Sequence, residues 1–315
     1  MNSLKSTHLA GLGKKYQGKV RDFYIVKDKR ILITTDRISA FDRILGEIPG
    51  KGQVLNLLSY FWFEKTKRII KNHVIKLPHP NVLIAKNATP IPLEMIVRGY
   101  ITGVTNTSIW GSYEKGERVI YGIKFPHGLS KNQKLKTPVI TPTTKAEKGH
   151  DERLTRNEII KRKIVSRKIY AEMEKAALAL FKKGTTICAK AGIILVDTKY
   201  EFGLLDGKLI LIDEIHTPDS SRYFYADGYQ EKFDKGEQQR QLSKEFVREW
   251  LMENNFSGQE GEKVPEMTDA IVTSISDRYI ELYEHITGEK FIKAVYDDAV
   301  YERIECNVKN MLARL

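Results

Sequence analysis

Acidic and basic side chains gather in residues 193–222, IILVDTKYEFGLLDGKLILIDEIHTPDSSR. Residues 193–202 alternate strictly, which predicts a strand with Asp197, Lys199 and Glu201 on one face. The opposite face would carry the residues that alternate with them, Ile194, Val196, Thr198, Tyr200 and Phe202. One face of this strand therefore presents two carboxylates and an amine.

A hairpin follows this strand. Asp206-Gly207 predicts a two-residue turn, and the return strand over residues 209–212 ends in Asp213. Regular pairing across such a turn would point Glu201 and Asp213 to opposite faces of the sheet. The two acids could share a metal only if an odd-length loop or a one-residue bulge shifts the parity, and we expect the shift at Gly203.

The pattern Asp-x-Lys-x-Glu also occurs in ordinary solvent-facing strands. Residues 209–212 are apolar, however, and a buried strand that delivers paired acids needs a cation to compensate them. Carboxylates without Cys or paired His suit Mg²⁺ or Ca²⁺ rather than zinc. A magnesium ion beside a lysine indicates phosphate chemistry.

A glycine turn, Gly18-Lys19-Val20-Arg21, opens the first strand pattern of the chain. Its backbone N–H groups and cations could lie over phosphates. Many surface hairpins contain Gly-Lys, and the pattern is not that of a Walker motif. Asp42 follows the end of the next strand, which is a usual position for a ligand group.

Two further groups of charged residues lie between these regions. Glu94 and Arg98 share a face of an apolar strand pattern over residues 91–100, and one buried ion pair would explain both. Lys145, His150 and Asp151 lie in a polar stretch that is either a charged flexible loop or a substrate lid.

The remaining chain supplies the elements that position these residues. Strands are predicted over residues 16–26, 30–35 and 73–86, a helix over 54–63, an irregular loop over 125–144, and helices over 243–253, 265–287 and the final stretch to 315. A capping box, Thr155-x-x-Glu158, predicts a long helix to about residue 183 that Gly184 closes. Pro90 and Pro92 predict a hinge that divides residues 1–90 from 91–315.

The composition, 41% hydrophobic and 29% charged over 315 residues, is that of an ordinary soluble globular protein. A net charge of +12 is typical of a nucleic-acid surface, a membrane surface or a pocket for polyanions, but the basic residues are scattered among 40 acidic ones. The only cysteines, Cys188 and Cys306, have neither disulfide-framework nor zinc-site spacing. The scatter of the basic residues argues against a nucleic-acid or membrane partner. The start of the chain lacks the apolar core of a signal peptide, so we expect a cytoplasmic protein.

Taken in order over residues 16–225, the motifs resemble those of the SAICAR synthetase family (phosphoribosylaminoimidazole-succinocarboxamide synthases) of purine biosynthesis. They are Gly-Lys-Val-Arg-Asp, Ser-Ala-Phe-Asp, Pro-Leu-Glu-x-Ile-Val-Arg-Gly-Tyr, Thr-Thr-Lys-Ala-Glu-x-Gly-His-Asp, Asp-Thr-Lys-x-Glu-Phe-Gly and Asp-Glu-x-x-Thr-Pro-Asp-Ser-Ser-Arg. The resemblance implies an α+β fold in which a small β-rich lobe (residues 1–90) lies over a larger α+β lobe (91–315), with ATP in the cleft between them. It implies a ligase that joins L-aspartate to the carboxylate of the carboxylated aminoimidazole ribotide, CAIR, with ATP and Mg²⁺. It makes no prediction about oligomeric state.

The resemblance also implies a role for each motif residue. Catalytic residues would be Lys199, Glu201 and Asp213. The ATP phosphates would lie under Gly18, Lys19, Val20 and Arg21, with Mg²⁺ held on them by Glu201 and Asp213. Asp42 and Glu94 would hold the imidazole carboxylate through a metal. Arg98 and Arg222 would bind the ribose 5-phosphate. Asp197, Lys199 and Asp219 would contact CAIR, and Lys145, His150 and Asp151 would contact aspartate or form the lid.

The chain departs from the family pattern at Val104, where many members have a phosphate-binding Ser. Thr102, Thr105 or a nearby residue would have to replace that hydroxyl. Two other interpretations compete with the ligase. A kinase-like small-molecule phosphotransferase would share the glycine turn and the acids, but it would not need Arg98 and Arg222 together with Glu94. A nucleic-acid-binding module would need aromatic residues interleaved with Lys and Arg on an exposed sheet.

Overall fold

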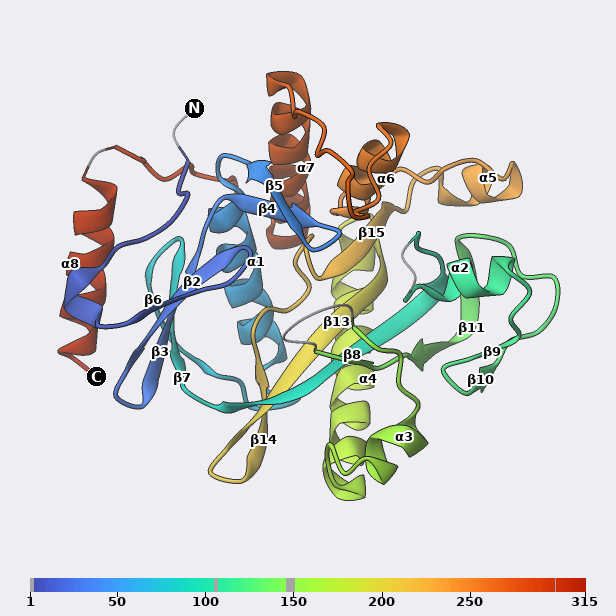
Figure 1. Ribbon diagram of the computed structural model, residues 1–315, viewed down its shortest axis with the longest axis horizontal. Coiled ribbons are helices and arrows are strands. Elements are labelled where there is room, and N and C mark those ends of the chain that lie inside the picture. Colours follow the sequence, from blue (N-terminus) through green and yellow to red (C-terminus); the bar gives the residue numbers. More distant parts are fainter. Residues whose placement is uncertain (1–2, 105–106, 146–150, 298) are drawn as a thin grey trace. The chain divides into compact units, whose positions relative to one another are not determined.

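Two compact units make up the chain in a computed structural model that describes residues 3–104, 107–145, 151–297 and 299–315. The first unit comprises Met1–Lys65, His73–Asn87 and Phe246–Leu315, and the second comprises Thr66–Asn72 and Ala88–Glu245. Each unit combines helices with antiparallel sheet, which confirms the predicted α+β class (Figure 1). Within the described ranges, none of the helices has the length and apolar character needed to cross a lipid bilayer.

The first unit is built on a five-stranded sheet of order β1-β2-β3-β7-β6 and a separate β4-β5 pair. Its elements are η1 (Ala10–Leu12), β1 (Lys15–Gln17), β2 (Arg21–Val26), β3 (Lys29–Thr34), β4 (Arg37–Ala40), β5 (Arg43–Glu47), α1 (Lys51–Thr66), β6 (Val74–His79), β7 (Val82–Lys86), α6 (Glu245–Glu253), α7 (Asp269–Thr287) and α8 (Val300–Leu312). Alternate residues of β3 and β7 point to opposite faces, so Ile31 and Ile84 pack with α8 while Leu32 and Leu83 pack with Tyr60 of α1.

The C-terminal helices belong with the N-terminal strands, which differs from the predicted division into residues 1–90 and 91–315. Ile304 and Val308 of α8 lie in one apolar cluster with Ile33 of β3, and Ser276 Oγ of α7 donates to the Pro49 carbonyl oxygen at 2.8 Å. These contacts join residues more than 200 positions apart. No local sequence pattern marks such a pairing, because an amphipathic helix does not specify which surface will cover its apolar face.

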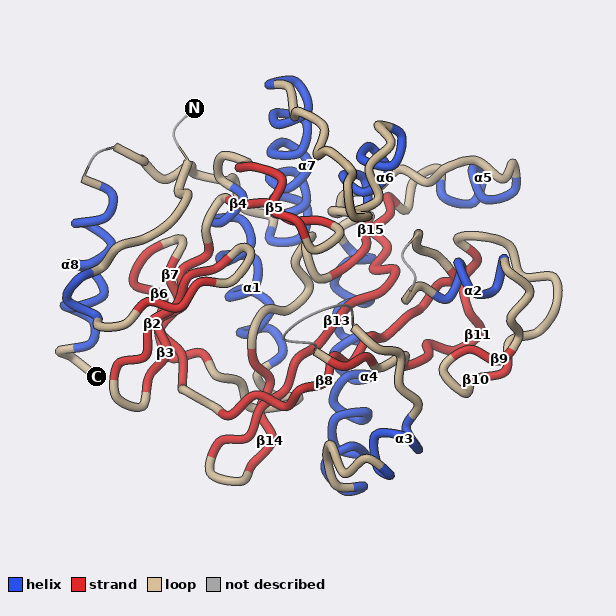
Figure 2. The backbone as a smooth tube through the Cα atoms, in the orientation of Figure 1, coloured by secondary structure: helices blue, strands red, loops and turns tan. Residues whose placement is uncertain are grey.

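The second unit is organised around a sheet of order β11-β8-β13-β14, with β12 paired to β8 and β15 paired to β13. Its elements are β8 (Thr89–Ile101), α2 (Ile109–Glu114), β9 (Val119–Ile120), β10 (Ile123–Lys124), β11 (Gln133–Ile140), β12 (Thr143–Thr144), α3 (Arg156–Lys161), α4 (Arg167–Lys190), β13 (Ile193–Leu205), β14 (Lys208–Ile212), β15 (Ser221–Tyr225) and α5 (Tyr229–Asp234). The two longest strands, β8 and β13, are neighbours, and α4 packs against one face of both (Figure 2).

A bulge at Val196 interrupts the predicted alternation of β13. Leu195 pairs with Tyr223 of β15, whereas Asp197 pairs with Arg222, so one extra residue lies between the two pairs. Val196 therefore packs with Ile194 in a cluster on the side of Tyr100, and Leu195 lies against α4. Asp197, Lys199 and Glu201 share one face of the strand, as predicted. Ile194 and Val196 were predicted on the opposite face, and that prediction was wrong.

Two predictions of local structure were wrong. The capping box at Thr155 and Glu158 is present, but it opens the short helix α3, which ends at Lys161. Lys163 has a positive φ of 55°, and a new helix then begins after the N-cap Ser166. The loop predicted over residues 125–144 contains β11 and β12, because pairing with β8 overrides a locally irregular pattern.

Gly184 lies inside α4 and does not close it, because the sheet and the loop after β14 approach the helix at this residue. A Cβ at position 184 would lie 2.5 Å from His216 Cε1 and 2.8 Å from Leu195 Cδ2. We expect Gly184→Ala to lower the free energy of unfolding by about 1–3 kcal/mol despite the better helix propensity of alanine. Urea denaturation measures the change, with Lys183→Ala, at an exposed position of the same helix, as the control. Equal or greater stability of Gly184→Ala would contradict this packing.

Candidate active site

Lys199 lies at the centre of a cluster of acids on paired strands. Glu201 of β13 lies directly opposite Glu94 of β8, so their side chains share a face of the sheet. The Lys199 ammonium donates to Glu94 Oε1 at 2.7 Å and to Glu201 Oε1 at 2.6 Å. Lys145 Nζ contacts the other oxygen, Glu201 Oε2. Two like charges placed opposite each other are thus held by two ammonium groups.

Burial governs the protonation of this cluster. Desolvation raises the pKa of Glu201 above its usual value, and the nearby Asp213 carboxylate raises it further against the effect of Lys199. Burial acts to lower the pKa of Lys199, but Glu201, Glu94 and Asp213 outweigh it and raise that pKa well above its ordinary value. The lysine is therefore charged throughout the neutral range.

Asp213 joins the cluster by a route that the sequence did not predict. The β13-β14 hairpin is regular from Leu205↔Lys208 to Glu201↔Ile212, so the expected bulge in this hairpin is absent and that prediction was wrong. Asp213 instead follows the last pair with a left-handed backbone, φ 66°. A residue in this conformation leaves the alternation of the strand, and its carboxylate lies close enough to act on both Glu201 and Lys199.

Gly203 has a different role from the predicted one. The pairing of β13 with β8 shifts between Glu201 and Gly203, on the side opposite β14. A Cβ at Gly203 would lie 2.9 Å from the Thr89 carbonyl oxygen. Glycine is needed here because the backbone of β8 comes close.

The donor set of this cluster fits a hard divalent cation. In the described part of the chain, no three His, Cys, Asp or Glu side chains already form a metal-binding group. Burial raises the pKa of Glu201, and the nearby Asp213 carboxylate raises it further, so the two acids disfavour each other's ionised form. A cation that binds both would remove this repulsion, and carboxylate oxygens suit Mg²⁺.

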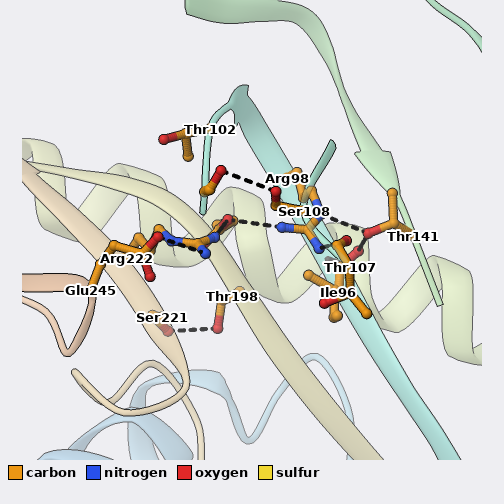
Figure 3. A network of polar contacts seen from close by, with 12 residues as sticks. Ile96, Arg98, Thr102, Thr107, Ser108, Thr141, Thr198, Ser221, Arg222 and Glu245 are labelled. Atoms are coloured by element: carbon orange, nitrogen blue, oxygen red, sulfur yellow. Dashed lines mark hydrogen bonds and ion pairs between the residues drawn. The ribbon is translucent and has the colours of Figure 1, made fainter. Parts of the chain in front are cut away.

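A second cluster on the same face of the sheet contains both predicted arginines. Arg98 of β8 and Arg222 of β15, both labelled in Figure 3, each form an ion pair with Asp197 of β13. One carboxylate therefore lies between two guanidinium groups. Asp197 Oδ2 accepts from Arg98 Nη1 at 3.3 Å and from Arg222 Nη1 at 2.5 Å. Arg98 does not pair with Glu94, so the ion pair proposed between them is replaced by pairs across the strands.

Further contacts fix the orientation of each guanidinium. Arg98 Nε donates to Thr141 Oγ1 at 2.8 Å and Nη2 donates to the Thr107 carbonyl at 3.1 Å. Burial lowers the pKa of Arg98 in spite of Asp197, whereas Asp197 and Glu245 outweigh burial and raise the pKa of Arg222. Arg222 Nε is buried without a hydrogen-bond partner among the described residues. A buried donor of this kind is costly unless a ligand accepts from it.

The loop after β8 contains the departure at Val104. The Thr102 hydroxyl is bonded to Asn132 at 2.6 Å, and the Ser108 hydroxyl donates to the Gly103 carbonyl and caps α2. Thr105 lies outside the described residues. The backbone N–H of Val104 donates to Glu245 Oε1 at 3.2 Å.

Other predicted residues are placed less centrally. The side chain of Asp219 is buried beside Lys244, at 3.5 Å, in the turn before β15. Asp151 is exposed, and His150 lies outside the described residues. Their assignments to substrates stay predictions.

In the first unit, the glycine turn connects β1 to β2. Gly18 N donates to the Arg21 carbonyl at 2.7 Å, and Lys19 Nζ contacts the Asp42 carboxylate on an exposed surface. Arg37 donates to the carbonyls of Gly18 and Lys19, each at 3.0 Å, and holds the turn in place. The roles of Gly18, Lys19, Val20, Arg21 and Asp42 toward ATP or metal stay predictions.

Three supporting residues were missed from the sequence, Arg37, Thr141 and Glu245. Arg37 lies between the end of β3 and Asp42, and a charged residue at a strand end was a usable signal. Thr141 and Glu245 gave none, because each meets its arginine from a segment remote in sequence.

A family model described as SAICAR synthetase matches residues 14–265 of the chain. The chain belongs to the SAICAR synthetase family. It is 54% identical over 319 residues to the phosphoribosylaminoimidazole-succinocarboxamide synthase of Bacteroides thetaiotaomicron, covering 100% of both chains. It is 50% identical over 318 residues to that of Cytophaga hutchinsonii, again covering 100% of both.

Solved structures of SAICAR synthetases share the fold. The SAICAR-synthase of Saccharomyces cerevisiae complexed with SAICAR matches with a TM-score of 0.78 at 34% identity, over 92% of this chain and 99% of that one. A type-2 SAICAR synthetase in complex with ADP matches with a TM-score of 0.67 at 27% identity, over 89% and 100%. As a member of the SAICAR synthetase family, the protein is a ligase of purine biosynthesis. This assignment replaces the kinase-like and nucleic-acid-binding interpretations.

Proposed function

We propose that the protein joins L-aspartate to the carboxylate of CAIR and converts ATP to ADP and phosphate, with SAICAR as product. The observation that carries the proposal is the order of side chains along one face of β13, with Asp197 between two arginines and then Lys199 and Glu201 among acids. Residues two apart on a strand are separated by about 6.6 Å. One face can therefore bind a phosphate at one end of a ribotide and a reacting carboxylate farther along.

The chemistry requires two steps because a carboxylate is a poor electrophile. In the first, a carboxylate oxygen of CAIR attacks the γ-phosphorus of ATP, and ADP leaves. In the second, the amine of aspartate attacks the acyl carbon, the bond to the phosphate oxygen breaks, and the amine loses a proton as inorganic phosphate leaves. The amide bond of SAICAR is the result.

Lys199 would neutralise charge on the transferred phosphoryl group. Its ammonium is held in position by Glu94 and Glu201 before substrates arrive, so little reorganisation is needed at the moment of reaction. Glu201 and Asp213 would hold Mg²⁺ on the ATP phosphates, with Glu94 and Asp42 as further metal ligands toward the carboxylate of CAIR. When bound, Mg²⁺ supplies charge neutralisation of the phosphates.

The arginine cluster would hold the ribotide. Arg98 and Arg222 offer planar donors that suit the oxygens of a phosphate, with Asp197 and Asp219 toward other polar groups of CAIR. Gly18 to Arg21 would cover the ATP phosphates, and Lys145, His150 and Asp151 would contact aspartate or act as a lid. The ADP and SAICAR in the related structures support ATP and CAIR as the substrates.

A coupled assay of ADP release tests the reaction. We expect turnover with CAIR, aspartate, ATP and Mg²⁺ together, and a loss of nearly all signal when CAIR or aspartate is omitted. CAIR is the acceptor in the first step, and the enzyme can turn over again only after aspartate has displaced phosphate from the acyl phosphate. Removal of Mg²⁺ with a chelator should stop release, and added Mg²⁺ should restore it. Equal ADP release with a sugar or protein hydroxyl in place of CAIR and aspartate would instead support a phosphotransferase.

A further inference from the structure

Glu245 connects the arginine cluster to the loop after β8. It is the last residue of the second unit, at the start of α6, and is 4% exposed. Its Oε1 lies 3.2 Å from Arg222 Nη2 and accepts from the Val104 backbone N–H, also at 3.2 Å. Figure 3 shows Glu245 reaching Arg222 on the side away from Arg98. A single oxygen atom thus binds a guanidinium and a backbone amide.

The loop lies tightly against this guanidinium. Gly103 has φ 101°, and a Cβ there would lie 2.7 Å from Arg222 Nη2 and 2.8 Å from Ser108 Cβ. Only glycine tolerates both the backbone conformation and this close approach. The position of Arg222 therefore depends on the loop, and Glu245 holds the two together.

We propose that Glu245 is a positioning residue that holds Arg222 and the Gly103-Val104 backbone in the geometry that binds the phosphate of the ribotide. This inference rests on the proposed function. Asp197 fixes Nη1 of Arg222 and Glu245 fixes Nη2, so the plane of the guanidinium is set by two carboxylates before a ligand arrives. Nε, buried and without a partner among the described residues, keeps its donor available.

Charge supports a positioning role. The cluster contains two guanidinium groups, Arg98 and Arg222, and two carboxylates, Asp197 and Glu245, so its formal charges cancel. Because the cluster has no net charge, its affinity for a phosphate depends mainly on where its hydrogen-bond donors are placed. A carboxylate that only balanced charge would work equally well from a shorter side chain, whereas a positioning carboxylate must reach both donors.

Substitutions at position 245 separate reach from charge. Glu245→Gln keeps an oxygen that can accept both hydrogen bonds and removes the charge. Glu245→Asp keeps the charge and withdraws the oxygens by one methylene. We expect Asp and Ala to raise the CAIR KM about tenfold or more, Gln to stay within about threefold, and kcat and the KM of ATP to change little. Glu253→Ala, an exposed acid of the same helix, is the matched control.

Binding of ribose 5-phosphate, measured by calorimetry, provides a readout that does not depend on turnover. The parent and the Gln variant should bind it with similar affinity, and the Asp and Ala variants about tenfold more weakly. If Ala fails to fold, Asp and Gln still decide the question. Parent-like Asp with impaired Gln, or four equal affinities, would overturn the positioning role, and so would a parent that does not bind ribose 5-phosphate. If the parent protein binds ribose 5-phosphate but releases no ADP with CAIR and aspartate, the proposed reaction would be wrong instead.

Discussion

Replacing Lys199 with methionine is expected to lower the rate of ADP release with CAIR and aspartate by about 10²-fold or more. The reason is that the ammonium contacts both acids, Glu94 at 2.7 Å and Glu201 at 2.6 Å. Methionine keeps the length of the side chain and removes the charge. Steady-state kinetics measure the loss, and Lys208→Met, at an exposed position in the same hairpin, serves as the control.

The same substitution should destabilise the fold. Removing one partner of a buried network costs about 3–5 kcal/mol, and we expect the lower end because the Lys199 side chain is 26% exposed. Adding Glu201→Gln should recover most of the stability without recovering activity. Recovery of activity in the double variant would show that Lys199 serves the fold rather than the reaction.

The loss of stability in the Lys199→Met variant should depend on pH, and the raised pKa values of Glu201 and Lys199 determine the direction. In the parent, Lys199 partly offsets the raised pKa of Glu201, so its removal raises that pKa further. Above pH 4.5, the folded variant then keeps a proton on Glu201 that the unfolded chain has released. Stability of the variant should therefore rise relative to the parent as pH falls from neutral toward 4.5. In the parent, the stabilisation by Lys199 persists at neutral pH and is lost only as pH rises through its raised pKa, above 10.5.

Changing Arg98 or Arg222 to lysine should raise the KM of CAIR by about 10- to 100-fold and leave that of ATP within about threefold. A single ammonium cannot replace the planar donors that bind Asp197 and, in the proposed function, also bind the phosphate of CAIR. The phosphate is remote from the reacting carboxylate, so kcat should change less than KM.

Arg167→Lys, at an exposed position of α4, provides the control for this pair. A change in the ATP KM rather than the CAIR KM would assign the two arginines to the other substrate. Melting temperatures should accompany the kinetics, because both arginines are buried and their loss also weakens the sheet.

Alternation and turn chemistry were enough to predict the central hairpin. The two-residue turn at Asp206-Gly207 and the shared face of Asp197, Lys199 and Glu201 depend on local geometry, and the structure has both. The bulge at Val196 was not predictable, because it arises from pairing with β15 and leaves no local signal.

The site was predictable to the extent that its residues lie in strands of strong pattern. Glu94 and Arg98 were predicted to face one side of β8, but their partners, Lys199 and Asp197, could be named only once β8 and β13 were known to pair. The contact of Glu245 with Arg222 could not be predicted, because a long connection separates the two residues in the sequence. The placement of the C-terminal helices with the N-terminal strands was not predicted for the same reason. The apolar face of a helix does not specify which sheet will cover it.

The left-handed backbone of Asp213 brings its carboxylate to Glu201 without any change of register in the hairpin. The pairing from residue 201 to residue 212 and the φ of 66° at residue 213 together set the direction of its carboxylate. The two-residue loop sets the register of that pairing, and the backbone at residue 213 then turns the carboxylate out of the alternation. For protein engineering, the exposed tip at Asp206-Gly207 is a natural point for insertion of a peptide tag or a fluorescent label, provided that the insertion keeps the register of the two strands.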